Sequence, residues 1–210
     1  MAKSREVMWR RTADDASFEH CKVREEPEGY RLSGTVLIAE DGIPLHVRYN
    51  VACDRHWQTR QVHVEQTWGG KRSALQLEHD GLGGWRLNGK DAPHLAGCTD
   101  VDLGVSPSTN ALPINRLKLP VGATAEIRAA WMLFPALDIV AAGQSYERLA
   151  ANQYRYRSVG TEFEALLDVD DDGLPITYAD LWERVAESTA TTDQFPPVRR
   201  ASESPRQPGG

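Results

Sequence analysis

The sequence predicts a mainly β fold in which one large antiparallel sheet rolls up around a single α-helix. Apolar and polar residues alternate with period two along most of the chain, as in strands with one buried and one wet face. Turn motifs rich in Gly, Asn and Asp separate these runs, and one strong helix start lies near the middle of the chain. Because a large open sheet leaves an apolar face and two edges unprotected, it is stabilised by rolling up or closing.

The clearest predicted strand begins at Ile43. Its inward positions are apolar, whereas His46, Arg48 and Asn50 point to the other face. The inward set is Ile43, Leu45, Val47, Tyr49, Val51 and Cys53. Similar alternation occurs at 30–38, 62–68, 75–77, 127–133, 154–156 and 163–169. Asn-Gly and Asp-Gly pairs tolerate the positive φ angles of tight hairpins, so we expect neighbouring runs to pair antiparallel as a meander.

The segment 108–119 is the best candidate for the enclosed helix. Thr109 or Asn110 can cap its first turn, and Pro113 is tolerated only in that turn. Apolar residues recur at helical spacing through the segment, and Pro120 follows the last of them. We therefore expect one helix here, enclosed by the rolled sheet.

A second, weaker helix candidate covers 177–187. Thr177 and Asp180 resemble a capping box. An apolar stripe follows, formed by Tyr178, Leu181, Trp182 and Val185. Residues 188–210 are mostly Ser, Thr, Pro, Gln, Arg and Gly, with almost no residues that can form a core. We expect a single domain over residues 1–187 and a disordered Pro/Ser/Arg-rich tail over residues 188–210.

Charge and hydropathy narrow the classes of partner. The net charge of −6 and the pI near 5.5 argue against nucleic-acid binding, which needs a concentrated basic surface. No apolar run is long enough to cross a bilayer, so the sequence predicts no membrane insertion. The first eleven residues are charged where a signal peptide would be apolar. We therefore expect a cytoplasmic protein.

The sequence offers no recognised metal or cofactor motif. Cys21, Cys53 and Cys98 are widely spaced and form no Cys-x-x-Cys pair, so we expect neither a disulfide nor a zinc site. The run Asp168–Gly173 matches the opening of a calcium loop, but Ala179 occupies the position of the closing Glu. That run indicates a charged hairpin turn instead. We find no phosphate loop or dinucleotide fingerprint, and the sequence predicts no cofactor.

Two aspartates are the first candidates for chemistry. Asp100 and Asp102 lie two apart, so on a strand both carboxylates face the same side and can share a proton, bind a cation or act as acid and base. They can equally cap backbone amides or pair with Arg116 beneath the helix. Asp100, Asp102, Asn110 and Arg116 form the candidate ligand-binding site within the central block of the sequence.

Six tryptophans can stack on sugar rings or line a site for acyl chains. We expect Trp85 and Trp131 in the core. Trp9 with the adjacent Arg10, and Trp57, are the better candidates for an exposed binding site.

The densest group of motifs lies between positions 84 and 119. It comprises Gly84-Trp85, Asn88-Gly89, Gly97–Leu103 and Ser106–Leu117. Further short motifs outside this group are Met8-Trp9-Arg10, Gln144–Arg148 and Asp170–Leu174 followed by Tyr178. Together they resemble a bacterial glycolipid-binding family, formerly a domain of unknown function. The resemblance implies a spiral β-roll, a homodimer, and a glycolipid or another amphiphilic small molecule as ligand. The chain departs from the family pattern at Asn115, where the pattern has Arg.

Three functions remain open from the sequence. The first is a binding module for an amphiphilic ligand, with apolar strand faces holding the tails and Arg holding the head group. It requires an apolar cavity with an open mouth. The second is an enzyme of unassigned class that uses Asp100 and Asp102 for proton transfer, which requires both carboxylates to converge in a pocket. The third is a structural dimerisation module without a small ligand, which requires a broad apolar surface patch.

Overall fold

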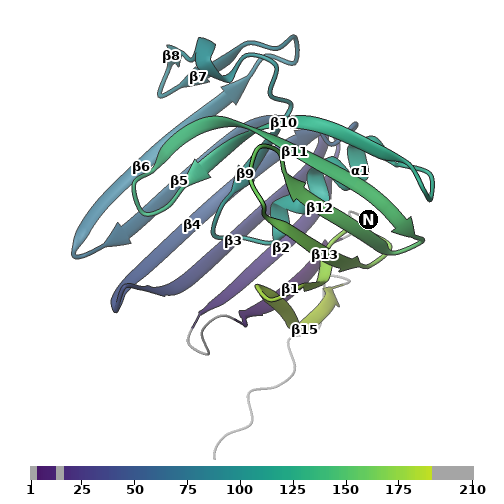
Figure 1. Ribbon diagram of the computed structural model, residues 1–210. Coiled ribbons are helices and arrows are strands. Elements are labelled where there is room, and N and C mark those ends of the chain that lie inside the picture. The colour runs from purple at the N-terminus through teal and green to yellow at the C-terminus, as the bar shows by residue number, and fades with distance from the viewer. Residues whose placement is uncertain (1–3, 13–16, 191–210) are drawn as a thin grey trace, which may run out of the picture.

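The computed structural model describes residues 4–12 and 17–190, and within these ranges a sheet of fifteen strands surrounds a single α-helix (Figure 1). The first eight strands are β1 (Ser4–Arg11), β2 (Phe18–Glu26), β3 (Gly29–Glu40), β4 (Ile43–Asp54), β5 (Thr59–Trp68), β6 (Lys71–His79), β7 (Trp85–Leu87) and β8 (Lys90–Asp91). The remaining strands are β9 (Asp100–Leu103), β10 (Thr124–Leu133), β11 (Asp138–Ala150), β12 (Gln153–Ser158), β13 (Glu164–Val169), β14 (Pro175–Tyr178) and β15 (Trp182–Ala190). The helices are α1 (Ala111–Leu117) and the 3-10 turns Pro93–Leu95 and Ser108–Asn110. The predicted mainly β fold around one helix is confirmed.

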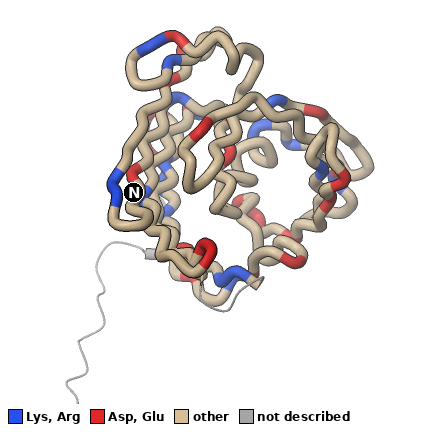
Figure 2. The backbone as a smooth tube through the Cα atoms, turned by 60° about the vertical axis from the view of Figure 1, so that its left-hand side comes forward, with Lys and Arg blue, Asp and Glu red and all other residues tan. Residues whose placement is uncertain are grey.

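The sheet places the two ends of the described chain side by side. Its strand order runs from β8 down to β1, passes from β1 to β15, and then runs down from β15 to β9. Every pair along the chain up to β8, and every pair from β10 to β15, is antiparallel. The β1–β15 pair is antiparallel as well. Figure 2 shows the backbone curving round into a ring.

The pairing of β9 with β10 departs from the expected antiparallel meander, because these two strands are parallel. Parallel neighbours need a long crossover connection, usually a helix, to bring the chain back to the same end of the sheet. The segment from Gly104 to Ala123 makes that connection and contains α1. The enclosed helix is thus the crossover of a β–α–β unit at the edge of the sheet.

The two ends of the sheet overlap, which gives the roll its spiral form. The Thr59 hydroxyl of β5 accepts a hydrogen bond from the backbone N–H of Val101 in β9, at 3.1 Å. The Trp85 indole N–H of β7 donates to the carbonyl of Cys98, at 3.0 Å. On β10, Ala130 and Met132 point away from the helix, because they alternate with residues that face it. Both are nevertheless fully buried. The edge around β9 and β10 is therefore covered on both faces.

The start of α1 differs from the predicted cap. Neither Asn110 nor Thr109 caps the α-helix with its side chain. The Thr109 hydroxyl accepts from the backbone N–H of Leu103, and the Asn110 amide donates to the Pro107 carbonyl. A 3-10 turn comes first, and the Ser106 hydroxyl accepts from the first N–H of that turn, Ser108, at 3.1 Å. Because the segment is buried, the side chains of both expected caps bind β9 and the preceding loop instead of the helix.

The helix predicted over 177–187 is wrong, because this segment forms the hairpin between β14 and β15. Tyr178 and Trp182 are directly paired across it, and Asp180 takes a positive φ of 61° in the turn. The i, i+4 spacing of two buried aromatics arises here from a tight hairpin rather than from a helix. The strand β15 also continues to Ala190, beyond the expected end of the domain at 187. The rest of the predicted tail lies outside the described residues.

Gly34 makes a close approach that is testable by substitution. It pairs with Tyr49 between β3 and β4, and the Tyr49 ring occupies the space that a Cβ atom at position 34 would need. We expect Gly34→Ala to displace this ring and to lower the free energy of unfolding by about 1–3 kcal/mol. Urea unfolding followed by circular dichroism measures the loss. In a Tyr49→Leu background the same substitution should cost far less, and an equal cost there would contradict the clash.

Candidate functional site

A cavity of about 390 Å³ lies inside the roll, beside the N-terminal end of α1. It is lined by strands β9 to β12 and by the β14–β15 hairpin, with the loop before α1 as its floor. The lining residues are Asp102, Leu103, Gly104, Ser106, Asn110, Trp131, Ala142, Gln144, Tyr156, Ser158, Thr161, Phe163, Tyr178, Leu181 and Trp182. The cavity thus joins segments that are up to eighty residues apart.

Five aromatic side chains line this cavity. The Tyr156 ring lies edge-on to Phe163 and to Tyr178, with ring centroids 5.9 Å and 6.1 Å apart. Trp131 and Phe163 are 37% and 42% exposed. The expectation that Trp131 is a core residue is therefore wrong. It lies where β10 approaches its end, so its ring reaches the mouth of the cavity rather than its interior.

Asp102 provides the charge of the cavity. The Gln144 amide donates to its carboxylate at 2.6 Å. Burial raises the pKa of Asp102 to about 6, although hydrogen bonds from Gln144 and Thr109 act in the opposite direction. The adjoining Tyr146 hydroxyl donates to the Asn110 side-chain carbonyl at 3.0 Å. Carboxylate, amide and hydroxyl groups therefore form a connected polar strip beside the aromatic side chains.

Asp100 does not share this environment. Its carboxylate is 1% exposed and accepts two hydrogen bonds from the Arg116 guanidinium, at 3.0 Å and 2.6 Å. The Thr99 hydroxyl donates to the same carboxylate at 2.9 Å. Asp100 and Asp102 lie two positions apart on β9 and face the same side of the strand, as predicted. Only Asp102 lines the cavity. The Asp100–Arg116 pair fastens α1 to β9, which is the structural alternative derived from the sequence.

The expectation of an exposed Trp9 is wrong. Its side chain is fully buried, and its indole N–H donates to the Pro175 carbonyl at 2.8 Å. The reason is that β1 lies in the middle of the sheet, so the inward positions of this strand belong to the core. The neighbouring Arg10 donates to the Glu183 carboxylate across the β1–β15 pair, at 3.0 Å, and does not line the cavity.

Trp57 lies in the turn between β4 and β5, at the other end of the helix. Its ring stacks on Tyr30, with centroids 3.9 Å apart. The two rings line a separate cavity of about 430 Å³ together with Asn115 and Lys118, at the C-terminal end of α1. The structure therefore does not bring Trp57 together with Asp102 and Asn110.

Glu19 is a site residue that sequence reasoning missed. It lies on β2 and is fully buried. Its carboxylate accepts hydrogen bonds from the Tyr49 hydroxyl and from the Ser106 hydroxyl, the latter at 2.8 Å. Burial raises its pKa to about 7, against the lowering effect of these bonds. Because Ser106 lines the cavity, Glu19 is one hydrogen bond behind its floor. The sequence signal that could have found Glu19 is its position two residues before Cys21, which places both side chains on the same inward face of the strand.

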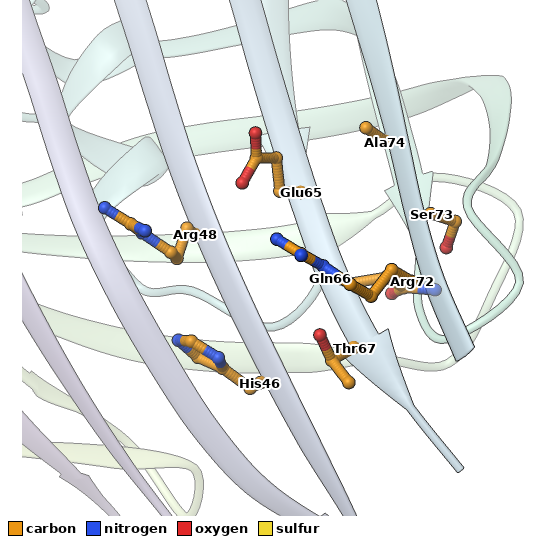
Figure 3. Close-up of a pocket in the computed structure, with 8 residues that line it drawn as sticks. All are labelled: His46, Arg48, Glu65, Gln66, Thr67, Arg72, Ser73 and Ala74. Carbon is orange, nitrogen blue, oxygen red and sulfur yellow. The ribbon is translucent and has the colours of Figure 1, made fainter. Parts of the chain in front are cut away.

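A different hollow, of about 270 Å³, lies mainly on the outer face of β4, β5 and β6 (Figure 3). The side chains around it project from three neighbouring strands without converging on one point. Arg48 is the cross-strand partner of Glu65, and His46 is that of Thr67. Such pairs are typical of the wet face of a sheet. We therefore place the candidate site in the inner cavity.

The turn after β13 is a charged hairpin, as predicted. The Asp170 carboxylate accepts from the backbone N–H groups of Asp172 and Leu174, and it forms an ion pair with Arg184 at 2.6 Å. No group of three His, Cys, Asp or Glu side chains suited to a metal occurs among residues 4–12 and 17–190. All three cysteines are buried free thiols. Over the same described ranges, no helix has the length and apolar character needed to span a bilayer.

Comparisons with known proteins agree with this architecture. The chain is similar to a crystal structure of a DUF1089 family protein from Pseudomonas aeruginosa, with a TM-score of 0.75 and 34% sequence identity, over 82% of this chain and 94% of that one. A β-barrel-like protein with a domain of unknown function, DUF1849, from Brucella abortus is 11% identical, with a TM-score of 0.42 over 91% of this chain and 99% of that one. A search of curated proteins finds no match. A family model described as "Putative glycolipid-binding" matches residues 6–184, and the chain therefore belongs to this family.

Proposed function

We propose that the protein binds a glycolipid, or a chemically similar amphiphile, with the sugar head group in the inner cavity and the apolar tails over its mouth. The observation that carries the proposal is the meeting of five aromatic side chains with Asp102, Gln144 and Asn110 in one cavity. The description of the family supports a ligand of this class. The predicted homodimer and cytoplasmic location remain parts of the proposal, and native mass spectrometry tests the first.

Size and chemistry support a sugar in the cavity. A volume of about 390 Å³ falls within the range of small-molecule sites. Aromatic rings offer flat apolar surfaces to the C–H faces of a sugar ring, whereas its hydroxyl groups need acceptors and donors around the rim. Asp102 and Gln144 supply these groups on one side, and Asn110 supplies them from the floor.

The mouth of the cavity supports binding of an apolar tail. Trp131 on β10 and Val140 on β11 are cross-strand partners, and they are 37% and 40% exposed. Phe163, at 42% exposure, lies at the same cavity. Exposed apolar side chains that adjoin a cavity are typical of ligand and lipid contacts. A ligand with a polar head and an apolar tail matches this change from polar strip to apolar rim.

Acid–base catalysis is a second candidate function, because Asp102 has a raised pKa and lines a cavity. The hypothesis from the sequence requires two carboxylates that converge in one pocket. The cavity does not contain such a pair, because the Asp100 carboxylate is bound by Arg116. Mass spectrometry of the ligand recovered after incubation distinguishes the two functions. Unchanged ligand supports binding, and a consistent mass change supports catalysis.

Trp131→Ala tests the proposed site. We expect at least a tenfold loss of affinity for n-octyl-β-D-glucoside, below its micelle concentration, because a large stacking surface at the mouth is removed. Isothermal titration calorimetry measures the affinity. Trp57→Ala is the matched control, since this ring lies at the other cavity, and it should bind like the wild type. Failure of the wild-type protein to bind any alkyl glycoside, or equal affinities for the two variants, would contradict the proposed site.

A further inference from the structure

We infer that the inner cavity selects its ligand by charge, with Asp102 as the specificity-determining residue: it accepts neutral polyhydroxylated head groups and rejects anionic ones such as uronates, phosphates and sulfates. This inference rests on the proposed function and narrows its ligand class. It also changes the idea derived from the sequence, in which an Arg side chain holds the head group.

The composition of the lining favours a neutral head group. Asp102 is the one acidic residue among the residues that line the cavity, and these include neither Lys, Arg nor His. An anion transferred from water into a partly enclosed site needs a counter-charge or several directed donors to offset the loss of hydration. The lining supplies a like charge instead.

The arginines of the elements around the cavity are bound elsewhere. Arg155, Arg157 and Arg184 form ion pairs with Glu147, Glu164 and Asp170, and Arg128 donates to the Ala96 carbonyl. Arg116 of α1 donates to the Asp100 carboxylate through its Nε and Nη2 atoms. Arg148 of β11 donates to the Leu119 carbonyl at 2.8 Å and to the carbonyls of the turn at 150–151. Turning any of these groups toward a ligand would break these contacts, and for Arg116 it would leave the buried Asp100 uncompensated.

The orientation of Gln144 also disfavours an anion. Its amide NH₂ donates to Asp102, so one of the two N–H donors of this amide is already bound by the carboxylate. The carboxylate can accept charge-assisted hydrogen bonds from the hydroxyl groups of a neutral sugar. An anionic group in the same position would instead face the charge of Asp102 with reduced screening by water. A neutral head group should therefore bind more tightly than an anionic head group of equal size.

The test compares two probes with the same tail and nearly the same ring, n-octyl-β-D-glucoside and n-octyl-β-D-glucuronide. Calorimetric titrations are made at pH 8, where Asp102 is ionised. We expect the wild-type protein to bind the glucoside at least tenfold more tightly than the glucuronide. In Asp102→Asn this ratio should fall below about threefold, chiefly because binding of the glucuronide improves. Asp138→Asn, which removes an exposed acid at the start of β11, is the matched control and should keep the wild-type ratio.

Each result has a distinct meaning. Equal wild-type affinities for the two probes would overturn selection by charge and leave the proposed function intact. Absence of binding for both probes would overturn the proposed function and this inference together. A ratio that survives in Asp102→Asn would overturn the assignment to Asp102. The wild-type comparison by itself tests the selection, so that part of the result does not depend on the folding of the variant.

Discussion

Replacement of Arg116 by alanine is expected to lower the free energy of unfolding by about 3–5 kcal/mol. The Asp100 carboxylate is 1% exposed, and Arg116 gives it two hydrogen bonds, at 3.0 Å and 2.6 Å. Without the guanidinium, a buried carboxylate keeps the Thr99 hydroxyl as a donor but has lost its counter-charge. Chemical denaturation with urea at pH 7, followed by circular dichroism, measures the loss.

A double-mutant cycle identifies the cause of this loss. Asp100→Asn removes the buried charge, so Arg116→Ala should cost much less in that background than in the wild type. The isolated Asp100→Asn substitution should also cost less than Arg116→Ala, because the Arg116 side chain is 20% exposed and can reach water. A loss below about 1 kcal/mol for Arg116→Ala, or additive losses in the cycle, would contradict an electrostatic fastening of α1 to β9.

The second large effect is a pH dependence of stability caused by Glu19. Its pKa is raised from 4.5 to about 7 by burial, so the folded protein binds this proton more tightly than the unfolded chain does. The stabilising contribution of the protonated form is complete below pH 4.5 and is lost as the pH rises toward 7. At about 1.4 kcal/mol per pKa unit, the total loss is about 3 kcal/mol. Burial of Asp102, with its pKa near 6, acts in the same direction.

Glu19→Gln isolates this contribution, because the variant cannot ionise at that position. Free energies of unfolding measured from pH 4.5 to pH 8 should fall more steeply for the wild type than for Glu19→Gln, by about 3 kcal/mol over the interval. Glu25→Gln, an exposed position on the same strand, should follow the wild-type curve. Parallel curves for the wild type and Glu19→Gln would show that Glu19 ionises equally easily in the folded and unfolded states.

Local patterns predicted the strands well, because each strand has one buried and one exposed face. The strand that begins at Ile43 is β4, and its alternating positions from Leu45 to Cys53 are buried as expected, while Ile43 itself is 37% exposed. The enclosed helix was also predictable, from residues at helical spacing and from Pro120 after the last of them, although its expected caps were not. What the alternation does not contain is the identity of each strand's neighbours.

The errors follow from that missing information. The burial of Trp9 depends on β1 lying in the middle of the sheet, and the exposure of Trp131 depends on the position of the cavity mouth. Both are properties of the closed roll rather than of the local sequence. The same holds for the site: Asp102 and Asn110 were predictable candidates, whereas the aromatic side chains that surround them come from strands distant in the sequence. Glu19 was missed because a single acidic residue in a strand is normally predicted to lie on the exposed face.

The pairing of β1 with β15 has a consequence for the order of events during biosynthesis. Among the described strands, β1 leaves the ribosome first and β15 last, so one edge of β1 stays unpaired until β15 has been synthesised. The meander from β1 to β8 can form from local contacts, but the ring around α1 needs contacts between residues more than 160 positions apart. The cavity, lined by residues from Asp102 to Trp182, therefore forms only after Trp182 has been synthesised. A nascent chain that lacks β15 has an incomplete ring and no closed inner cavity.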